Sequence, residues 1–128
     1  MTEIILFLGL LLNSNMVITA YRSVPAQTDT SPNFTSIGDR THKGGVAVSR
    51  DLLSRWKGPL NYGDYIYIED MGIYQVNDVM NDTTYDKLTH KRFKLRQHID
   101  IWVASRDEEK KIGVQTKRVY IIKRRINE

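Results

Sequence analysis

The clearest pattern in this sequence is a strict alternation of apolar and polar side chains over residues 98–103. Branched apolar residues fall on one face of this segment, whereas His98, Asp100 and Trp102 fall on the other. A period of two residues is that of a β-strand with one buried face. We therefore expect a strand here whose apolar face points into the core.

Two further strands lie close together in the chain. Residues 65–69 and 72–80 are rich in β-branched and aromatic side chains and are separated only by Asp70 and Met71. A connection of this length is typical of a tight β-hairpin. The sequence therefore predicts an antiparallel pair in the middle of the chain.

Other segments complete a mainly β pattern. Residues 16–21 alternate β-branched or apolar side chains with small and polar ones, and residues 46–49 and 118–124 also have the composition of short strands. Together these segments predict a small barrel of about six strands. The residues expected to face its interior are Val76, Ile99, Ile101, Val103 and Ile121.

Short helices are predicted at two places. Residues 105–113 begin with Ser105, a favourable N-cap, carry acidic side chains first and lysines later, and end at Gly113. Residues 50–56 predict a short helical turn that Ser49 is placed to cap. One or two short helices should therefore accompany the barrel.

The remaining stretches are polar. Residues 22–45 combine prolines, glycines and many hydroxyl-bearing or amide side chains, which predicts a long irregular surface loop. Residues 81–96 are polar and basic. Long loops in small domains often form binding rims or lids.

Length and composition are those of one folded domain. The chain has 128 residues, of which 41% are hydrophobic and 27% are charged, and this size can bury one modest core. It has no cysteine, so disulfides, a thiolate nucleophile and cysteine-ligated zinc are excluded. Its histidines show no close pairing of the HxxxH kind, so neither a metal site nor a cofactor is expected.

The beginning of the chain is apolar. Residues 4–12 form an apolar run that is too short for the roughly 20 residues of a membrane span. It fits the core of an export signal, but residues 1–3 lack a positive charge and residues 13–15 are a poor cleavage site. An export segment and a retained apolar strand or helix both stay open for residues 1–15, and the domain is expected over residues 16–125.

The chain is basic, with a net charge of +4 and a pI near 9.4. This charge favours polyanionic surroundings such as nucleic acid, anionic lipid or an acidic cell wall. Basic residues gather in segments 91–96 and 117–125, which are most often solvated faces. No nucleic-acid-binding motif accompanies them, so a nucleic-acid partner is not expected.

The order of the segments resembles a known family. The segments that carry the resemblance are VITAY (17–21), TDTSP (28–32) with Thr35, Ser36 and Gly38, GVAVS (45–49), YGDYIYIEDMGIYQVND (62–78), IDIWV (99–103) and Gly113. This succession is similar to the three-aspartate (3D) domain, the module of membrane-bound lytic transglycosylase A and of small bacterial wall-active proteins. The resemblance implies a six-stranded double-psi β-barrel.

The resemblance also implies a catalytic pair. Asp78 and Asp100 align with the second and third aspartates of the family, whereas Ser49 stands in place of the first. Val79 follows Asp78 where the family often has threonine. Asp51, two positions after Ser49, either supplies a carboxylate from a shifted position or is an ordinary charge near a helix start.

The activity implied by the resemblance is that of a peptidoglycan lytic transglycosylase. Such an enzyme cleaves the bond between N-acetylmuramic acid and N-acetylglucosamine and forms a 1,6-anhydro product. Asp100 would be the single general acid and base, and Asp78 would be its ionised partner. Desolvation and the neighbouring charge would raise the pKa of Asp100. Without the resemblance, Asp100 would ordinarily be interpreted as a solvent-facing strand residue and Asp78 as a turn residue.

Substrate contacts are expected from the same segments. Trp102, Tyr74 and Tyr21 are candidates for a sugar-stacking surface, although core packing is the commoner fate of strand aromatics. Hydroxyl-bearing side chains could bind sugar or acetamido groups, although many will satisfy their own backbone. These candidates are Thr19, Thr35, Ser36 and Ser49.

Two other functions stay open. The missing first aspartate at Ser49 favours a non-catalytic module that binds peptidoglycan or another polysaccharide. Small size and the imperfect signal segment fit a phage virion protein built on the same barrel. The expected partners are peptidoglycan glycan strands, with virion or envelope proteins as further candidates and with no stable membrane span. The expected location is extracytoplasmic, in the cell envelope, periplasm or medium, or in a phage virion.

Overall fold

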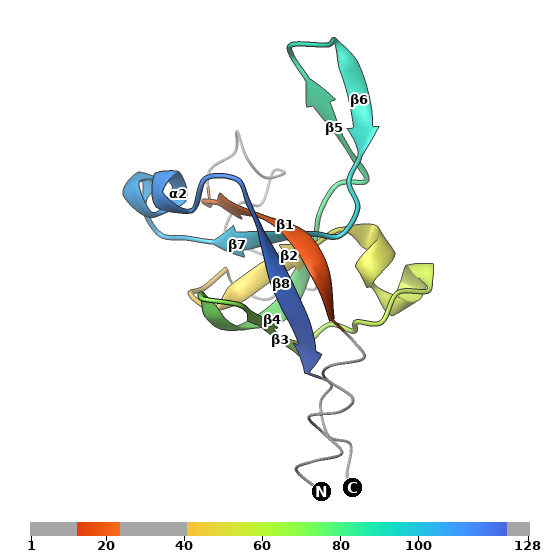
Figure 1. Cartoon of the computed structure of the whole chain (residues 1–128), viewed down its shortest axis with the longest axis vertical. Helices are drawn as coiled ribbons and strands as arrows, with labels where there is room; N and C mark the ends of the chain where they lie inside the picture. The colour runs from red at the N-terminus through yellow and green to blue at the C-terminus, as the bar shows by residue number, and fades with distance from the viewer. Residues whose placement is uncertain (1–12, 24–40, 123–128) are drawn as a thin grey trace, which may run out of the picture.

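The structure is a computed structural model, and it describes residues 13–23 and 41–122. Six strands close into a barrel in the order β1-β7-β2-β4-β3-β8 (Figure 1). The mainly β barrel expected from the sequence is therefore confirmed. The barrel strands are β1 (Asn13–Tyr21), β2 (Gly45–Val48), β3 (Tyr65–Ile68), β4 (Gly72–Val79), β7 (His98–Trp102) and β8 (Gln115–Ile122).

The barrel mixes parallel and antiparallel neighbours. The pairs β1–β7 and β2–β4 are parallel, and the other four are antiparallel. Strands β3 and β4 form the predicted hairpin. At its turn, Asp70 and Gly72 adopt φ angles of 67° and 114°, in the region that glycine enters without a steric penalty. The parallel pairs bring together segments that are far apart in the sequence.

The core fills the inside of the barrel. All five residues predicted to face the interior are buried. They pack with branched side chains from all the remaining barrel strands, because the alternation places one apolar face of each strand inward. The largest fully buried apolar side chains are Ile18, Leu60, Ile66, Ile68, Ile99, Val46, Val48, Val76 and Val119.

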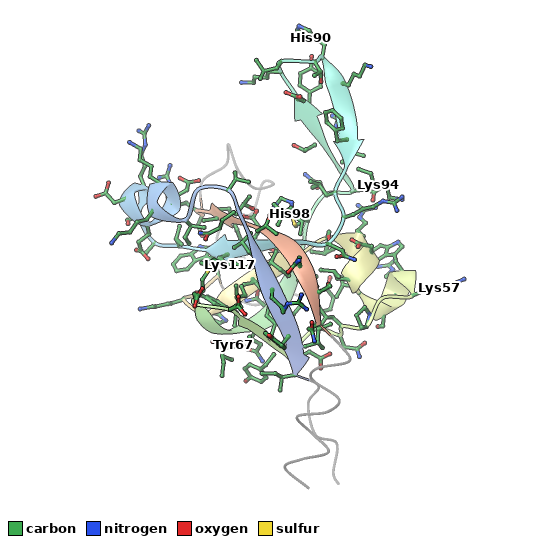
Figure 2. The ribbon with its side chains drawn as sticks, viewed as in Figure 1. Lys57, Tyr67, His90, Lys94, His98 and Lys117 are labelled. Carbon is green, nitrogen blue, oxygen red and sulfur yellow. The ribbon has the colours of Figure 1, made fainter. Side chains whose placement is uncertain are left out.

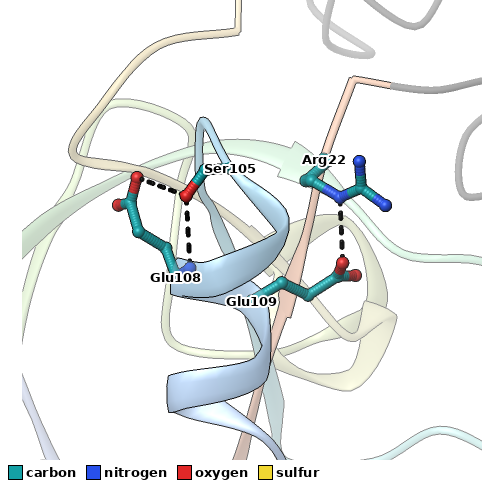
Figure 3. A network of polar contacts seen from close by, with 4 residues as sticks. All are labelled: Arg22, Ser105, Glu108 and Glu109. Carbon is teal, nitrogen blue, oxygen red and sulfur yellow. Dashed lines mark hydrogen bonds and ion pairs between the residues drawn. The ribbon is translucent and has the colours of Figure 1, made fainter.

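Helix α2 (Arg106–Ile112) follows β7 and has the predicted cap. Ser105 Oγ accepts a hydrogen bond from Glu108 N and donates one to the Glu108 carboxylate, both at 3.2 Å (Figure 3). The bond from Glu108 N is a side-chain N-cap that satisfies one of the first N–H groups of the helix, and Gly113 ends the helix as expected. The cap fixes how α2 begins after the end of β7.

The turn after β2 differs from its prediction in one respect. Residues 50–56 form two short 3₁₀ helices, η1 (Arg50–Leu52) and η2 (Ser54–Trp56), rather than one helical turn. Ser49 occupies the N-cap position of η1, but its side chain makes no capping hydrogen bond. The Ser49 hydroxyl instead accepts a hydrogen bond of 3.0 Å from His98 N.

Some boundaries also differ from those expected. Strand β1 begins at Asn13, and residues 13–15 pair with β8, so they belong to the barrel rather than to the apolar leading segment. Strand β8 begins at Gln115, before residue 118. Residues 1–12 and most of the long loop, residues 24–40, lie outside the described residues. None of the helices in the described part has the length and apolar character that a membrane crossing requires.

Candidate functional site

The two candidate catalytic aspartates lie on strands that flank β2. Ala47 of β2 pairs with Asp100 of β7 on one side and with Asp78 of β4 on the other. Residues paired across neighbouring strands point to the same face of a sheet. Asp78 and Asp100 therefore share one face of the barrel wall, and Ala47 lies between them.

A β-bulge gives Asp78 this orientation. Val46 pairs with Val76 in the interior, but the next residue, Ala47, pairs with Asp78, so Asn77 is an additional residue on β4. With uninterrupted alternation, Asp78 would point inward with Val76. The bulge turns Asp78 to the outer face, and bulges commonly re-aim side chains in this way next to functional sites.

Close backbone packing accompanies the bulge. A Cβ atom added to Gly45 would lie 2.6 Å from Asn77 Nδ2, which is too close for any side chain. Asn77 is buried, and its Nδ2 lies 3.4 Å from His42 Nε2. Among the described residues, Asn77 Oδ1 has no hydrogen-bond partner. A side chain at position 45 would therefore force the buried Asn77 side chain to shift.

Thr19 extends the row of site residues onto β1. It pairs with Asp100 across the parallel β1–β7 ladder, and its hydroxyl donates a hydrogen bond of 2.9 Å to Asp100 Oδ1. The same hydroxyl lies 2.7 Å from His98 Nε2. Among the described residues, Thr19 provides the side-chain hydrogen bond to the Asp100 carboxyl group, and it does so at Oδ1. Thr19 thus fixes the orientation of the Asp100 carboxyl group.

The proton count of this contact assigns the direction of both hydrogen bonds. Ionised Asp100 can only accept, so the single hydroxyl proton of Thr19 is donated to it. Thr19 must then accept from His98 Nε2, which makes the neutral imidazole the Nε2–H tautomer. Burial lowers the pKa of His98 below its usual 6.5, which favours the neutral ring.

The environment of Asp100 makes it a weak acid for an aspartate. Burial is the main cause that raises its pKa from 3.8 to about 6, and the Thr19 hydrogen bond opposes this rise. The charges of Glu109 and Asp78 raise the pKa further. At mildly acidic pH, Asp100 is therefore protonated in a larger fraction of molecules than an aspartate of ordinary pKa, and the protonated form is the one that a general acid needs.

Tyr21 lies beside both aspartates. Burial is the main cause that raises the pKa of its phenol well above the usual value, and the charges of Asp78 and Asp100 act in the same direction. Asp78 itself accepts a hydrogen bond of 2.8 Å from Val79 N. Because the charges of both carboxylates raise the pKa of the same phenol, Tyr21, Asp78 and Asp100 lie close enough to interact electrostatically.

An ion pair between Glu109 of α2 and Arg22 lies near Asp100. Glu109 Oε1 lies 2.9 Å from Arg22 Nε, and both side chains are partly buried (Figure 3). Arg22 directly follows β1, so this contact joins α2 to the strand that carries Thr19 and Tyr21. Glu109 is close enough to raise the pKa of Asp100.

Ser49 and Asp51, which lie close together at the end of β2, are not part of this row of site residues. Ser49 is fully buried and bonded to the backbone of His98, so it is a structural residue and is closed to the substrate contact expected for it. The carboxylate of Asp51 accepts from Gln97 N, with Oδ2 at 3.0 Å. Asp51 thus holds the segment that leads into β7.

The three aromatic residues that were candidates for sugar stacking do not form one surface. Trp102 is half-buried, and its indole Nε1 donates a hydrogen bond of 2.8 Å to Ser23 Oγ, beside the pair Tyr21–Trp102. Tyr21 is buried, so it lacks the exposed ring face that stacking requires. Tyr74 pairs with the interior residue Ile66 and packs against the core, away from the outer face. Thr35 and Ser36 lie outside the described residues.

Sequence reasoning missed His98 and Glu109. His98 had a usable signal, because residues two apart on a strand share a face and Asp100 follows at that spacing. The sequence contains no comparable signal for Glu109, because the distance from Glu109 to Asp100 depends on how α2 packs against β1. In the described ranges, no cluster of three or more histidine or acidic side chains could hold a metal ion.

Comparisons of the chain with protein-family models and with curated proteins find no match. The function of the site has to be inferred from its geometry.

Proposed function

We propose that this row of residues is the active site of a peptidoglycan lytic transglycosylase, with Asp100 as its single general acid and base. The observation that carries the proposal is the state of Asp100: a carboxyl group on the outer face of the barrel, oriented by Thr19, whose pKa is raised to about 6. A carboxyl group whose pKa lies near 6 is partly protonated and partly ionised in mildly acidic solution, so it can both deliver and accept a proton.

In the proposed reaction, protonated Asp100 donates its proton to the oxygen between N-acetylmuramic acid and N-acetylglucosamine. The bond from that oxygen to the anomeric carbon breaks as positive charge develops on the sugar ring. Asp100, now ionised, accepts the proton of the C6 hydroxyl, whose oxygen closes the 1,6-anhydro ring. Atoms and charge balance with no water consumed and no second carboxylate as nucleophile.

The other groups of the row support these steps. Ionised Asp78 would stabilise the positive charge on the ring, because it lies across Ala47 from the acid. Thr19 would keep Asp100 Oδ1 occupied and so direct proton transfer through Oδ2. The resemblance to the three-aspartate domain supports the same assignment at two of its three aspartates.

The test is digestion of purified sacculi followed by mass spectrometry of the soluble products. The wild-type chain should release muropeptides that carry the anhydro ring, and Asp100→Asn should release none above background. Asp107→Asn, which removes an exposed carboxylate from α2, is the matched control and should retain activity. Products with reducing ends instead of anhydro rings would contradict the proposed mechanism.

A non-catalytic glycan-binding module is the second candidate. The observation that favours it is Ser49, which stands where the family has an aspartate and is committed to a hydrogen bond with His98 N. Under this alternative, the wild-type chain would cosediment with sacculi without releasing soluble fragments. Asp100→Asn would then leave the amount of bound protein unchanged.

A further inference from the structure

A two-stranded hairpin projects from the barrel as a separate sheet. Strands β5 (Thr83–Asp86) and β6 (Lys91–Lys94) pair only with each other among the described residues, and the ribbon extends away from the barrel wall (Figure 1). The sequence predicted only a polar and basic segment here.

The turn of this hairpin is well defined. Asp86 Oδ1 accepts from Leu88 N at 2.9 Å and Asp86 Oδ2 from Thr89 Oγ1 at 3.0 Å, while His90 N donates to Asp86 O. His90 lies at the tip and Lys94 near the base of the ribbon (Figure 2). Asp86 therefore closes the turn and holds the apex in one conformation.

The hairpin carries a concentrated positive charge. Residues 83–96 contain five basic side chains and one acidic side chain, a net charge of +4 that equals the net charge of the whole chain. The rest of the protein is therefore electrically balanced. The only acid of the segment, Asp86, is the residue that closes the turn. The basic residues are Lys87, Lys91, Arg92, Lys94 and Arg96.

The same ribbon exposes large apolar side chains. Leu88 is 92% exposed in the turn, and Tyr85 and Phe93 are 50% and 47% exposed. Phe93 pairs with Thr84 and Tyr85 with Arg92, so the two aromatic rings lie on opposite faces of the ribbon. Both faces thus combine an aromatic ring with basic groups, and the turn adds one exposed leucine.

We propose that the β5–β6 hairpin docks tip first on an anionic lipid surface. In this orientation Leu88 enters the apolar layer, the two aromatic rings sit at the headgroup level, and the basic groups of both faces meet lipid phosphates. A nucleic acid would use the positive charge, but it offers no apolar layer for an exposed leucine apex. The two-sided distribution and the exposed leucine of the turn together favour a membrane surface.

Cosedimentation of the full chain with vesicles tests the proposal. The chain should bind vesicles of phosphatidylcholine with phosphatidylglycerol and not vesicles of phosphatidylcholine alone. Lys91→Gln with Lys94→Gln should weaken binding about 25-fold, since each lysine near an anionic surface contributes about fivefold. The matched control, Lys110→Gln with Lys111→Gln on α2, loses the same charge and should bind much more like the wild type.

The apex is tested separately from the charge. Leu88→Ser should weaken binding about 10-fold at unchanged net charge, because the buried apolar area of the leucine is lost. The chain has no cysteine, so Leu88→Cys can be labelled uniquely with a polarity-sensitive dye. Its emission should shift to the blue on anionic vesicles, whereas the dye on Asp107→Cys should not respond.

Two results would overturn the proposal. The first is equal vesicle binding by the wild type and by the hairpin variants whose circular dichroism spectra match it. The second is binding of a short DNA duplex, lost in Lys91→Gln with Lys94→Gln, in a protein that leaves anionic vesicles unbound. Neither readout depends on glycan cleavage, so this proposal and the proposed enzymatic function fail independently.

Discussion

Thr19 donates a hydrogen bond of 2.9 Å to Asp100 Oδ1 across the parallel β1–β7 pair, and this contact sets the protonation of the site. The hydrogen bond favours the ionised carboxylate and so lowers a pKa that burial raises. The balance between these two effects holds the pKa of Asp100 at about 6.

Thr19→Val should therefore raise the pKa of Asp100 above its wild-type value. Valine keeps the branched shape of threonine but cannot donate, so desolvation acts unopposed. Carboxyl carbon chemical shifts followed by NMR across pH 4–9 would measure the change. Thr116→Val, an exposed threonine on β8, should leave the Asp100 titration unchanged. A pKa that falls in Thr19→Val would contradict the assigned direction of the hydrogen bond.

The tautomer of His98 follows from the same contact. Above the pKa of Asp100, the ring should carry its hydrogen on Nε2, because the Thr19 hydroxyl proton is committed to the carboxylate. Imidazole ¹⁵N shifts at pH 8 distinguish the two tautomers directly. In Thr19→Val the preference should weaken, since the acceptor for Nε2–H is removed. A wild-type ring with its hydrogen on Nδ1 would be inconsistent with this chain of hydrogen bonds.

Much of the barrel follows from local patterns, but the site depends on contacts between distant segments. Residues 98–103 and the β3–β4 hairpin were predictable because alternation and a short turn are visible in adjacent residues. The orientation of Asp78 was not, since the bulge at Asn77 depends on its packing against Gly45. The β5–β6 hairpin was also missed, because a ribbon exposed on both faces has no apolar side to mark its period.

Gly45→Ala should destabilise the protein by about 1–3 kcal/mol, the usual cost of forcing extra atoms into a packed region. The added methyl group would meet the side chain of Asn77 at 2.6 Å, and this buried side chain would have to shift. Urea denaturation measures the free energy of unfolding. The double substitution with Asn77→Ala removes the obstructing amide, so it should be more stable than the sum of the single changes indicates. Strict additivity would show that Asn77 is not the obstacle.

Asp100→Asn should stabilise the folded state at pH 8 and not at pH 4. The folded pKa of Asp100 is raised from 3.8 to about 6, so its favourable contribution is complete below pH 3.8 and is lost as the pH rises through 6. At pH 8 the wild type holds a charge that is partly desolvated, and the neutral amide avoids this cost, by up to about 3 kcal/mol. Urea denaturation at both pH values measures the difference. Glu69→Gln, an exposed carboxylate at the end of β3, should have little effect at either pH.

If the proposed transglycosylase activity holds, its rate should fall as the pH rises above about 6, because Asp100 must begin the reaction protonated. Thr19→Val should move this decline to higher pH, since it raises the pKa of the acid, even if misorientation of the carboxyl lowers the maximum rate. Asp78→Asn should move the decline to lower pH, because it removes a charge that raises the pKa of Asp100. The rate of anhydro-muropeptide release between pH 4.5 and 8.5 measures all three profiles. A purely structural role for Thr19 or Asp78 would change the height of the profile but leave its midpoint in place. Opposite shifts of the midpoint in the two variants would therefore show that Thr19 and Asp78 act on the pKa of Asp100 and not only on the stability of the fold.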